Sequence, residues 1–276
     1  IHLNTGKIYA SAGIKTGAVD VIMSEEDSFR LPIVAEEANE VFLEENKVPH
    51  VLVSTHKLNY KGEKYHKVRR FSPFQNRGDL AHALKNGLNE DEKIKIAREI
   101  AEGLFRMHRL DMAHRDIKPE NILLGENGAV LTDFGTSGKK GHIGDRPFNL
   151  SYDKQVGTNF YLAPDSRDLS QRARIFDVTK QEKEVDMWAL GLVYLQLFFN
   201  MSPDDLENDR WDYSVLLRSI RNKVLELKAQ HPNDPYLHLI ERMLDQNPAT
   251  RLTAEELVFE LDKISAPLPL SLVPPA

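Results

Sequence analysis

Two short motifs at a fixed spacing constrain this chain more than any other feature. The first is the run His114 to Leu124, which reads HRDIKPENILL, and the second is Asp133-Phe134-Gly135, which begins twelve residues after Asn121. Phosphoryl transfer needs a carboxylate that orients the attacking hydroxyl, a cation near the moving phosphate and oxygen ligands for Mg²⁺. These groups are present in that order, as Asp116, Lys118, Asn121 and Asp133.

The hydrophobic pattern changes character near residue 80. Before that point the apolar runs are short and bounded by turn residues, which predicts strands at 18–23, 29–34, 51–54 and 64–71. One helix is predicted among them, over 35–47, with Ala38, Val41 and Phe42 on its apolar face. After that point the period is helical, which predicts helices at 91–108, 185–199, 234–245 and 253–264. The last of these opens with a capping pattern at Thr253.

The two motifs together resemble the catalytic and metal-binding loops of the eukaryotic-type protein kinases. The resemblance runs from about Gly78 to Leu261, and three further motifs carry it: Gly157-Thr158 with Ala163-Pro164-Asp165, Asp186-x-Trp188-x-x-Gly191, and Asn247-Pro248-x-x-Arg251. It implies a two-lobed α+β fold, with a small β-rich lobe over 1–75, a larger helical lobe over 76–264 and a Pro-rich tail over 265–276. His114 is expected to be a packing residue bonded to backbone.

The resemblance also implies an activity, which is transfer of the γ-phosphoryl group of ATP to a protein hydroxyl with Mg²⁺. Asp116 would orient that hydroxyl, Lys118 would stabilise charge on the transferring group, and Asn121 and Asp133 would ligate the metal. In the family, a Lys two residues after the catalytic Asp marks the Ser/Thr kinases, and Thr158 fits the Thr that bonds both. Asp186 would hold the catalytic-loop backbone, and Arg251 would pair with Asp165, where the family usually has Glu.

The small lobe departs from the family pattern, because no G-x-G-x-x-G precedes Gly78. One interpretation takes Ala12 to Lys15 as the strand that carries the phosphate-binding lysine. The other takes Tyr9 to Gly17 as a substitute nucleotide loop from which Lys15 reaches in. Lys15 is the first candidate under either interpretation and Lys7 is the second.

The helix over 35–47 is expected to supply the acid that pairs with this lysine. Glu40 fits best by its distance to Val48-Pro49-His50, and Glu37 is the alternative one turn earlier. Counting back from Gly78 places Ser72 at the position that limits access behind adenine. Pro73 to Gln75 then form the hinge, whose backbone would bond the base, so Pro73 and Gln75 are predicted cofactor-binding residues.

Composition excludes some functions and leaves others open. With no cysteine the chain has no disulfide and no cysteine nucleophile, and a net charge of −6 argues against wholesale nucleic-acid binding. No apolar run approaches membrane-spanning length, and a cytoplasmic location is expected, in the host cytoplasm if the chain is a secreted bacterial effector. Residues 56–70 hold six basic side chains against Glu63. That segment is either a solvated face or a docking patch for an acidic partner.

Two other functions compete with a protein kinase. The missing glycine-rich loop suits a pseudokinase, an interaction scaffold on the same fold. A small-molecule phosphotransferase would share the catalytic Asp and the later Asn, but typically lacks the elements found at Lys118, Asp165 and Arg251. In the family, an Arg before the catalytic Asp usually goes with control by phosphorylation, so the resemblance and Arg115 imply a phosphorylation site between Asp133 and Asp165, with Ser151 as the expected one.

Overall fold

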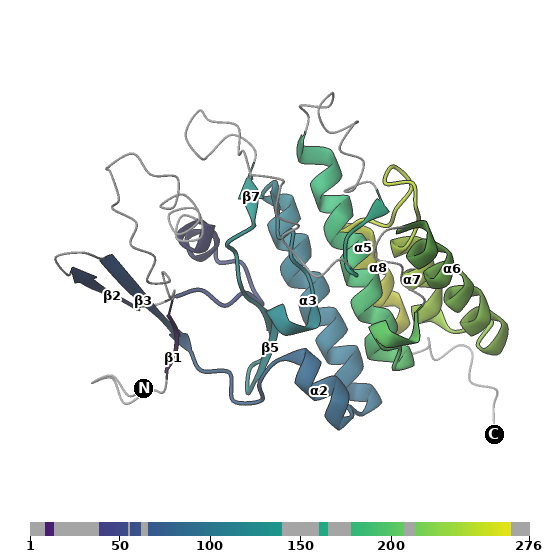
Figure 1. Cartoon of the computed structure of the whole chain (residues 1–276), viewed down its shortest axis with the longest axis horizontal. Coiled ribbons are helices and arrows are strands. Elements are labelled where there is room, and N and C mark those ends of the chain that lie inside the picture. Colours follow the sequence, from purple (N-terminus) through teal and green to yellow (C-terminus); the bar gives the residue numbers. More distant parts are fainter. Residues whose placement is uncertain are drawn as a thin grey trace, which may run out of the picture. The chain divides into compact units, whose positions relative to one another are not determined.

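The computed structural model of the chain describes residues 9–13, 39–54, 56–61, 66–139, 160–164, 178–206 and 213–265. These residues belong to two compact units, Ile1–Gly157 and Thr158–Ala276. The described part of the first unit holds three small antiparallel sheets, a short helix over 39–45 and the helices α2 and α3, whereas that of the second is helical (Figure 1).

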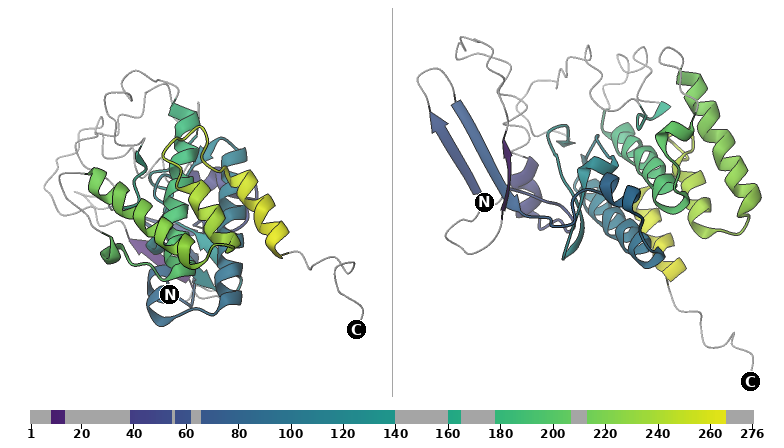
Figure 2. Two further views of the ribbon diagram at one scale, coloured as in Figure 1. Left: turned by 90° about the vertical axis from the view of Figure 1, so that its right-hand side faces the viewer. Right: turned by 60° about the horizontal axis from the view of Figure 1, so that its bottom comes forward.

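The largest sheet has three antiparallel strands in the order β1-β3-β2. Its strands are β1 (Tyr9–Gly13), β2 (His56–Lys61) and β3 (His66–Pro73). β2 and β3 form the long hairpin in the right-hand panel of Figure 2, with Lys57 opposite Arg70. β3 confirms the described part, 66–71, of the strand predicted at 64–71. The interpretation of Tyr9 to Gly17 as a loop is wrong for its first five residues, because Tyr9–Gly13 pair with β3 in the register Gly13 opposite Arg69.

A helix covers residues 39–45 of the predicted 35–47. Its buried face is not the predicted one, since Val41 is 43% exposed while Leu43 is fully buried. Asn39 and Glu40 are also buried, and both have polar partners inside the protein, which offsets the cost of removing them from water. The helix is thus rotated relative to the orientation that its apolar residues alone predicted.

Residues 51–54 do not form the predicted strand. Val51 makes a single parallel bridge to Leu131, and the backbone on either side of it is bonded to the same residue. Leu52 N donates to Leu131 O at 2.8 Å, and Leu131 N donates to His50 O at 2.8 Å. This segment therefore ties the short helix to the strand that precedes Asp133.

The helices that follow the three-stranded sheet are α2 (Leu80–Asn86) and α3 (Glu90–Arg109), the second as predicted. α3 begins with a capping box in which the Asn89 side chain accepts from Glu92 N and the Glu92 carboxylate accepts from Asn89 N. The Asn89 N–H, and then the Arg77 guanidinium, lower the pKa of the Glu92 carboxyl below its ordinary value. These contacts fix the start of the helix that carries much of the apolar core of this unit.

Two small antiparallel pairs of strands follow α3. β4 (Met112–Ala113) pairs with β7 (Gly138–Lys139), and β5 (Ile122–Gly125) pairs with β6 (Gly128–Leu131). The segment after β3 is joined to them, since Arg77 N donates to Leu124 O and Leu124 N donates to Gly78 O. The small lobe and the two motif loops therefore belong to one compact unit, and the predicted lobe boundary at residue 75 stays a prediction.

The second unit is built around α5 (Val178–Phe199), which is buried from Asp186 to Leu197 as its continuous apolar run predicts. α7 (Pro235–Met243) packs against α5, and α6 (Tyr213–Gln230) and α8 (Ala254–Ser265) pack against α7 (Figure 2). Gly191 allows the close approach of α5 and α7, because a Cβ there would lie 2.9 Å from Leu244 Cδ2. α6 was not predicted from the sequence.

Arg251 is buried beside α5 rather than exposed. It donates to Glu184 O at 2.7 Å and to Asp245 O at 2.9 Å, and its guanidinium lies over the Trp188 ring. Its predicted partner Asp165 lies outside the described residues, as do the predicted strands at 18–23 and 29–34 and the tail beyond 265. No helix within the described ranges is both long enough and apolar enough to cross a bilayer.

Candidate active site

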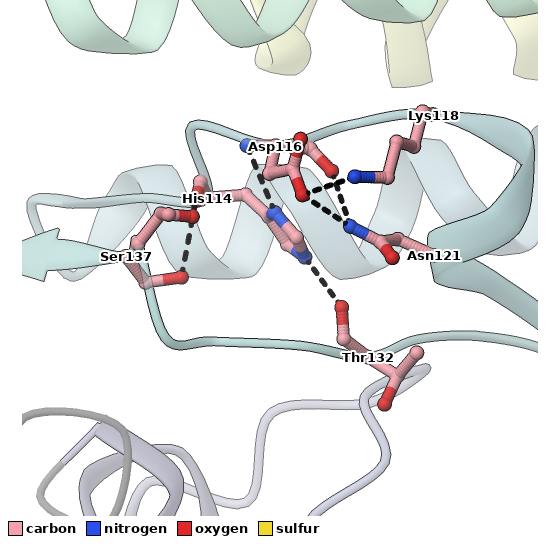
Figure 3. Close-up of polar contacts among 7 residues, drawn as sticks. His114, Asp116, Lys118, Asn121, Thr132 and Ser137 are labelled. Atoms are coloured by element: carbon pink, nitrogen blue, oxygen red, sulfur yellow. Dashed lines mark hydrogen bonds and ion pairs between the residues drawn. The ribbon is translucent and has the colours of Figure 1, made fainter. Parts of the chain in front are cut away.

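The first motif forms a loop that is fixed at both ends by strand pairs. It follows β4, passes through the 3-10 turn η1 (Pro119–Asn121) and enters β5, while Asp133 follows β6, the partner of β5. Thr132 N also donates to Asn121 O at 3.0 Å. The two motifs are therefore held side by side (Figure 3).

Three of the predicted residues form one hydrogen-bonded cluster. Lys118 Nζ lies 2.6 Å from Asp116 Oδ2, and Asn121 Nδ2 donates to the same oxygen at 2.8 Å and to the Asp116 carbonyl at 2.8 Å (Figure 3). Both donors converge on Oδ2. Within the described parts of the chain no donor to Oδ1 is found, so this oxygen keeps its capacity to accept a hydrogen bond.

His114 connects the two motifs and is fully buried. Its Nδ1 accepts from Asp116 N at 3.3 Å, and its Nε2 is bonded to Thr132 O at 3.1 Å (Figure 3). Both bonds are satisfied when the ring carries its proton on Nε2. Its ring also contacts the buried Phe134 ring, with 5.3 Å between centroids. The prediction that His114 is a packing residue bonded to backbone is confirmed.

Asp133 is exposed and has a left-handed backbone with φ of 66°, a region that Asp tolerates better than most residues. The turn after it is closed by Ser137 N, which donates to Phe134 O at 3.2 Å. The Thr136 and Ser137 hydroxyls both donate to His114 O, each at 3.2 Å. Asp133 is thus an exposed carboxylate on a tightly held backbone.

Asn121 and Asp133 are suitable in chemistry for the predicted Mg²⁺. Asn121 donates through its Nδ2 to Asp116, which leaves its Oδ1 as the atom able to face a metal, and Asp133 supplies a carboxylate. Mg²⁺ is usually held by one or two protein carboxylates together with water and phosphate oxygens. The described ranges contain no group of three or more His, Asp or Glu side chains that could hold a metal by themselves.

The predicted nucleotide-binding residues of the small lobe are only partly described. Lys15, Lys7 and Glu37 lie outside the described residues. The Glu40 carboxylate is buried and accepts from Ser54 N at 3.3 Å and from Ser54 Oγ at 3.2 Å. Its pairing with Lys15 stays a prediction.

The predicted hinge lies where β3 ends. The Pro73 carbonyl accepts a 3.3 Å bond from Gln75 Nε2, and the Gln75 side chain packs against Gly125, where a Cβ would lie 2.0 Å from Gln75 Oε1. Ser72 is half-buried at the end of the strand. Because proline has no N–H, a base bound here can receive a backbone donor only from Phe74 or Gln75 within the predicted three residues.

The sequence interpretation missed Asn39. Its Nδ2 donates to Phe134 O and to Ser137 O, each at 2.9 Å, across the turn that follows Asp133. The signal in the sequence was its position four residues before the apolar Leu43, because residues four apart share a helix face.

Residues 160–164 are anchored within the second unit. Gln196 Nε2 donates to the Tyr161 hydroxyl at 2.9 Å, and the Tyr213 hydroxyl donates to Leu162 O. Ala163 is fully buried. Thr158, the predicted partner of Asp116 and Lys118, lies outside the described residues, so that role stays a prediction.

Comparison with known proteins identifies the fold and the family. The family model for the protein kinase domain matches residues 30–260, so the chain belongs to the protein kinase family and has its two-lobed α+β fold. The predicted family is confirmed.

Several curated relatives are Ser/Thr protein kinases. The chain is 28% identical over 279 residues to serine/threonine-protein kinase SSK22 of Saccharomyces cerevisiae, which covers 92% of this chain and 20% of that protein. It is 34% identical over 166 residues to serine/threonine-protein kinase Sgk1 of Homo sapiens, covering 60% of this chain and 34% of that protein. The chain thus spans only a fifth to a third of the length of these relatives.

Proposed function

We propose that this chain is a protein Ser/Thr kinase that transfers the γ-phosphoryl group of ATP to a protein hydroxyl. The observation that carries the proposal is the convergence of Lys118 and Asn121 on one oxygen of Asp116. Family membership supports it, and the relatives described above are named as Ser/Thr kinases.

The Asp116 carboxylate performs the proton chemistry. With Oδ2 held by two donors, Oδ1 accepts the hydrogen bond of the substrate hydroxyl and orients its oxygen toward the phosphorus. Lys118 lies beside this carboxylate, where its ammonium stabilises the negative charge on the transferring group. A Lys two residues after the catalytic Asp marks the Ser/Thr kinases of the family, which supports Ser and Thr as acceptors, and Thr158 is proposed to bond both residues.

Asn121 and Asp133 would hold Mg²⁺, which neutralises phosphate charge when it is bound. The protein's own contribution is to fix these two oxygens, through the Asn121 bonds to Asp116 and the turn after Asp133. For the nucleotide, the proposal keeps Lys15 with Glu40 as the phosphate clamp and the backbone of Pro73 to Gln75 as the adenine contact.

Several finer points belong to the proposal. The β2–β3 hairpin bears the basic segment 56–70 and is a proposed docking element for an acidic partner, in addition to the protein substrate. Ser151 is the proposed phosphorylation site, and it lies outside the described residues. A cytoplasmic location is also part of the proposal, in the cytoplasm of the host if the chain is a secreted effector.

The deciding experiment incubates the chain with labelled ATP, Mg²⁺ and a general protein substrate, with Asp133→Ala as the comparison. Label on protein serine or threonine that depends on Asp133 supports the proposal. Nucleotide binding without any transfer would favour the pseudokinase. Transfer to a small molecule, with no label on protein, would favour the small-molecule phosphotransferase.

A further inference from the structure

Asn39 holds both ends of the turn that follows Asp133. It is the first described residue of its helix and only 5% of it is exposed. Its Nδ2 donates to Phe134 O and to Ser137 O, each at 2.9 Å, while Ser137 N closes the turn onto Phe134 O. A primary amide has two N–H donors, and here each of them has a carbonyl acceptor. The opposite amide orientation would place oxygen against oxygen, so the bonds fix the side chain as well as the turn.

The same turn is held from its other side by the catalytic loop. The Thr136 and Ser137 hydroxyls donate to His114 O, and His114 Nε2 bonds Thr132 O. Asp133 therefore lies between Thr132, whose carbonyl is bonded to His114, and Phe134, whose carbonyl is bonded to Asn39. Its own φ of 66° is a conformation that needs support from its surroundings.

We propose that Asn39 is a positioning residue for Asp133, which links the helix of residues 39–45 to the direction of that carboxylate. The inference rests on the proposed metal role of Asp133. Leaving the buried Asn39 amide without acceptors would cost free energy. The helix of residues 39–45 and the turn after Asp133 therefore stabilise each other in their present positions. A shift of the helix would release the turn, and with it the backbone that aims Asp133.

Two substitutions separate this role from simple packing. Asn39→Asp keeps the shape but replaces two donors with a negative charge that faces two carbonyl oxygens. Asn39→Ala removes the donors without adding a charge. The matched control is Asn46→Asp near the end of the same helix, because Asn46 is exposed and its Nδ2 donates to Phe42 O, one turn away.

The experiment measures the melting temperature of the whole chain with ATP at increasing Mg²⁺, and records the Mg²⁺ concentration at half of the maximal shift. We expect Asn39→Asp and Asn39→Ala to raise this midpoint about tenfold, a change of about 1.4 kcal/mol, and to lower kcat for labelled ATP. Asn46→Asp should keep the wild-type midpoint. If Asn39→Asp does not fold, Asn39→Ala alone decides the question.

A purely structural Asn39 would lower the melting temperature without nucleotide and leave the Mg²⁺ midpoint unchanged. That result in Asn39→Ala, with a normal Mg²⁺-dependent shift in the wild type, would overturn the inference and leave the proposed function standing. A wild-type chain whose ATP shift does not depend on Mg²⁺ would overturn the metal role itself, and the inference with it.

Discussion

Lys118 Nζ lies 2.6 Å from Asp116 Oδ2, and the same oxygen is the acceptor for Asn121. Residues at positions two and five after the aspartate thus converge on a single carboxylate oxygen. The turn η1 at Pro119–Asn121 brings Asn121 back toward Asp116, which an extended loop of the same length would not do. The other carboxylate oxygen is the one that we propose accepts from a substrate hydroxyl.

Asp116→Asn should abolish phosphoryl transfer and leave ATP binding close to normal. The amide cannot accept the hydroxyl proton, and its NH₂ group would also face the Lys118 and Asn121 donors if it took the place of Oδ2. Transfer of label from ATP and the thermal shift with ATP measure the two effects. Asp91→Asn, an exposed position in the first turn of α3, is the control. Substantial transfer by Asp116→Asn would remove Asp116 from its assigned role.

Lys118→Ala should lower kcat by about 10²- to 10³-fold, the usual loss when one preorganised charge-stabilising donor is removed from an active site. KM for ATP should change much less, because the Lys118 ammonium lies beside the Asp116 carboxylate rather than at the predicted hinge. Steady-state kinetics with labelled ATP test this. Lys95→Ala is the control, since Lys95 is exposed on α3 and its Nζ makes a long, 3.8 Å ion pair with Glu99 Oε1. A rise in KM with unchanged kcat would contradict the proposal.

Lys15→Met should lower activity about 10²-fold or more if Lys15 contacts the phosphates of ATP. Lys7→Met is the paired variant, because Lys7 is the second candidate for the same role. The kinase assay and the ATP-dependent thermal shift are measured for both. Normal turnover in Lys15→Met together with a loss in Lys7→Met would reassign the clamp to Lys7.

The start of α8 should make stability depend on pH. Thr253 N and Oγ1 both donate to Glu256 Oε2 at 2.9 Å, and Glu256 N donates to Thr253 Oγ1 at 3.2 Å. The backbone bond from Thr253 is the largest cause that lowers the pKa of the Glu256 carboxyl below its ordinary value. This contribution is therefore present at a pH above the ordinary pKa of about 4.5 and is lost as the pH falls through the lower folded-state pKa.

Thr253→Ala should lower the free energy of unfolding at pH 7 by about 1 kcal/mol, the usual value of a lost N-cap. Glu256→Gln should remove the pH-dependent part of this contribution to the free energy of unfolding, because the amide does not titrate. Urea unfolding at pH 7 and near pH 3.5 measures both, and the difference between wild type and Glu256→Gln should narrow at the lower pH. A difference that widens there would contradict the sign of the pKa shift.

The sequence alone determined the parts of this protein that depend on local chemistry. The motif spacing placed Asp116, Lys118 and Asn121 in one loop, the 3.6-residue period placed α3, α5 and α7, and the Thr-Ala-Glu-Glu pattern placed the start of α8. Each of these follows from residues a few positions apart. That is the range over which helix periodicity, capping and turn chemistry act.

The tertiary structure decided what depends on residues far apart in the chain. Asn39 lies 95 residues from Phe134 in the sequence, and the Phe134 carbonyl is one of the acceptors that allow its amide to be buried. The same holds for Val51, whose apolar run predicted a strand but whose one partner is Leu131, and for Tyr9–Gly13, which become a strand only by pairing with β3. A polar side chain can be buried, and a short segment can become a strand, when groups far away in the sequence satisfy their hydrogen bonds. The fold, not the neighbouring sequence, sets which groups these are.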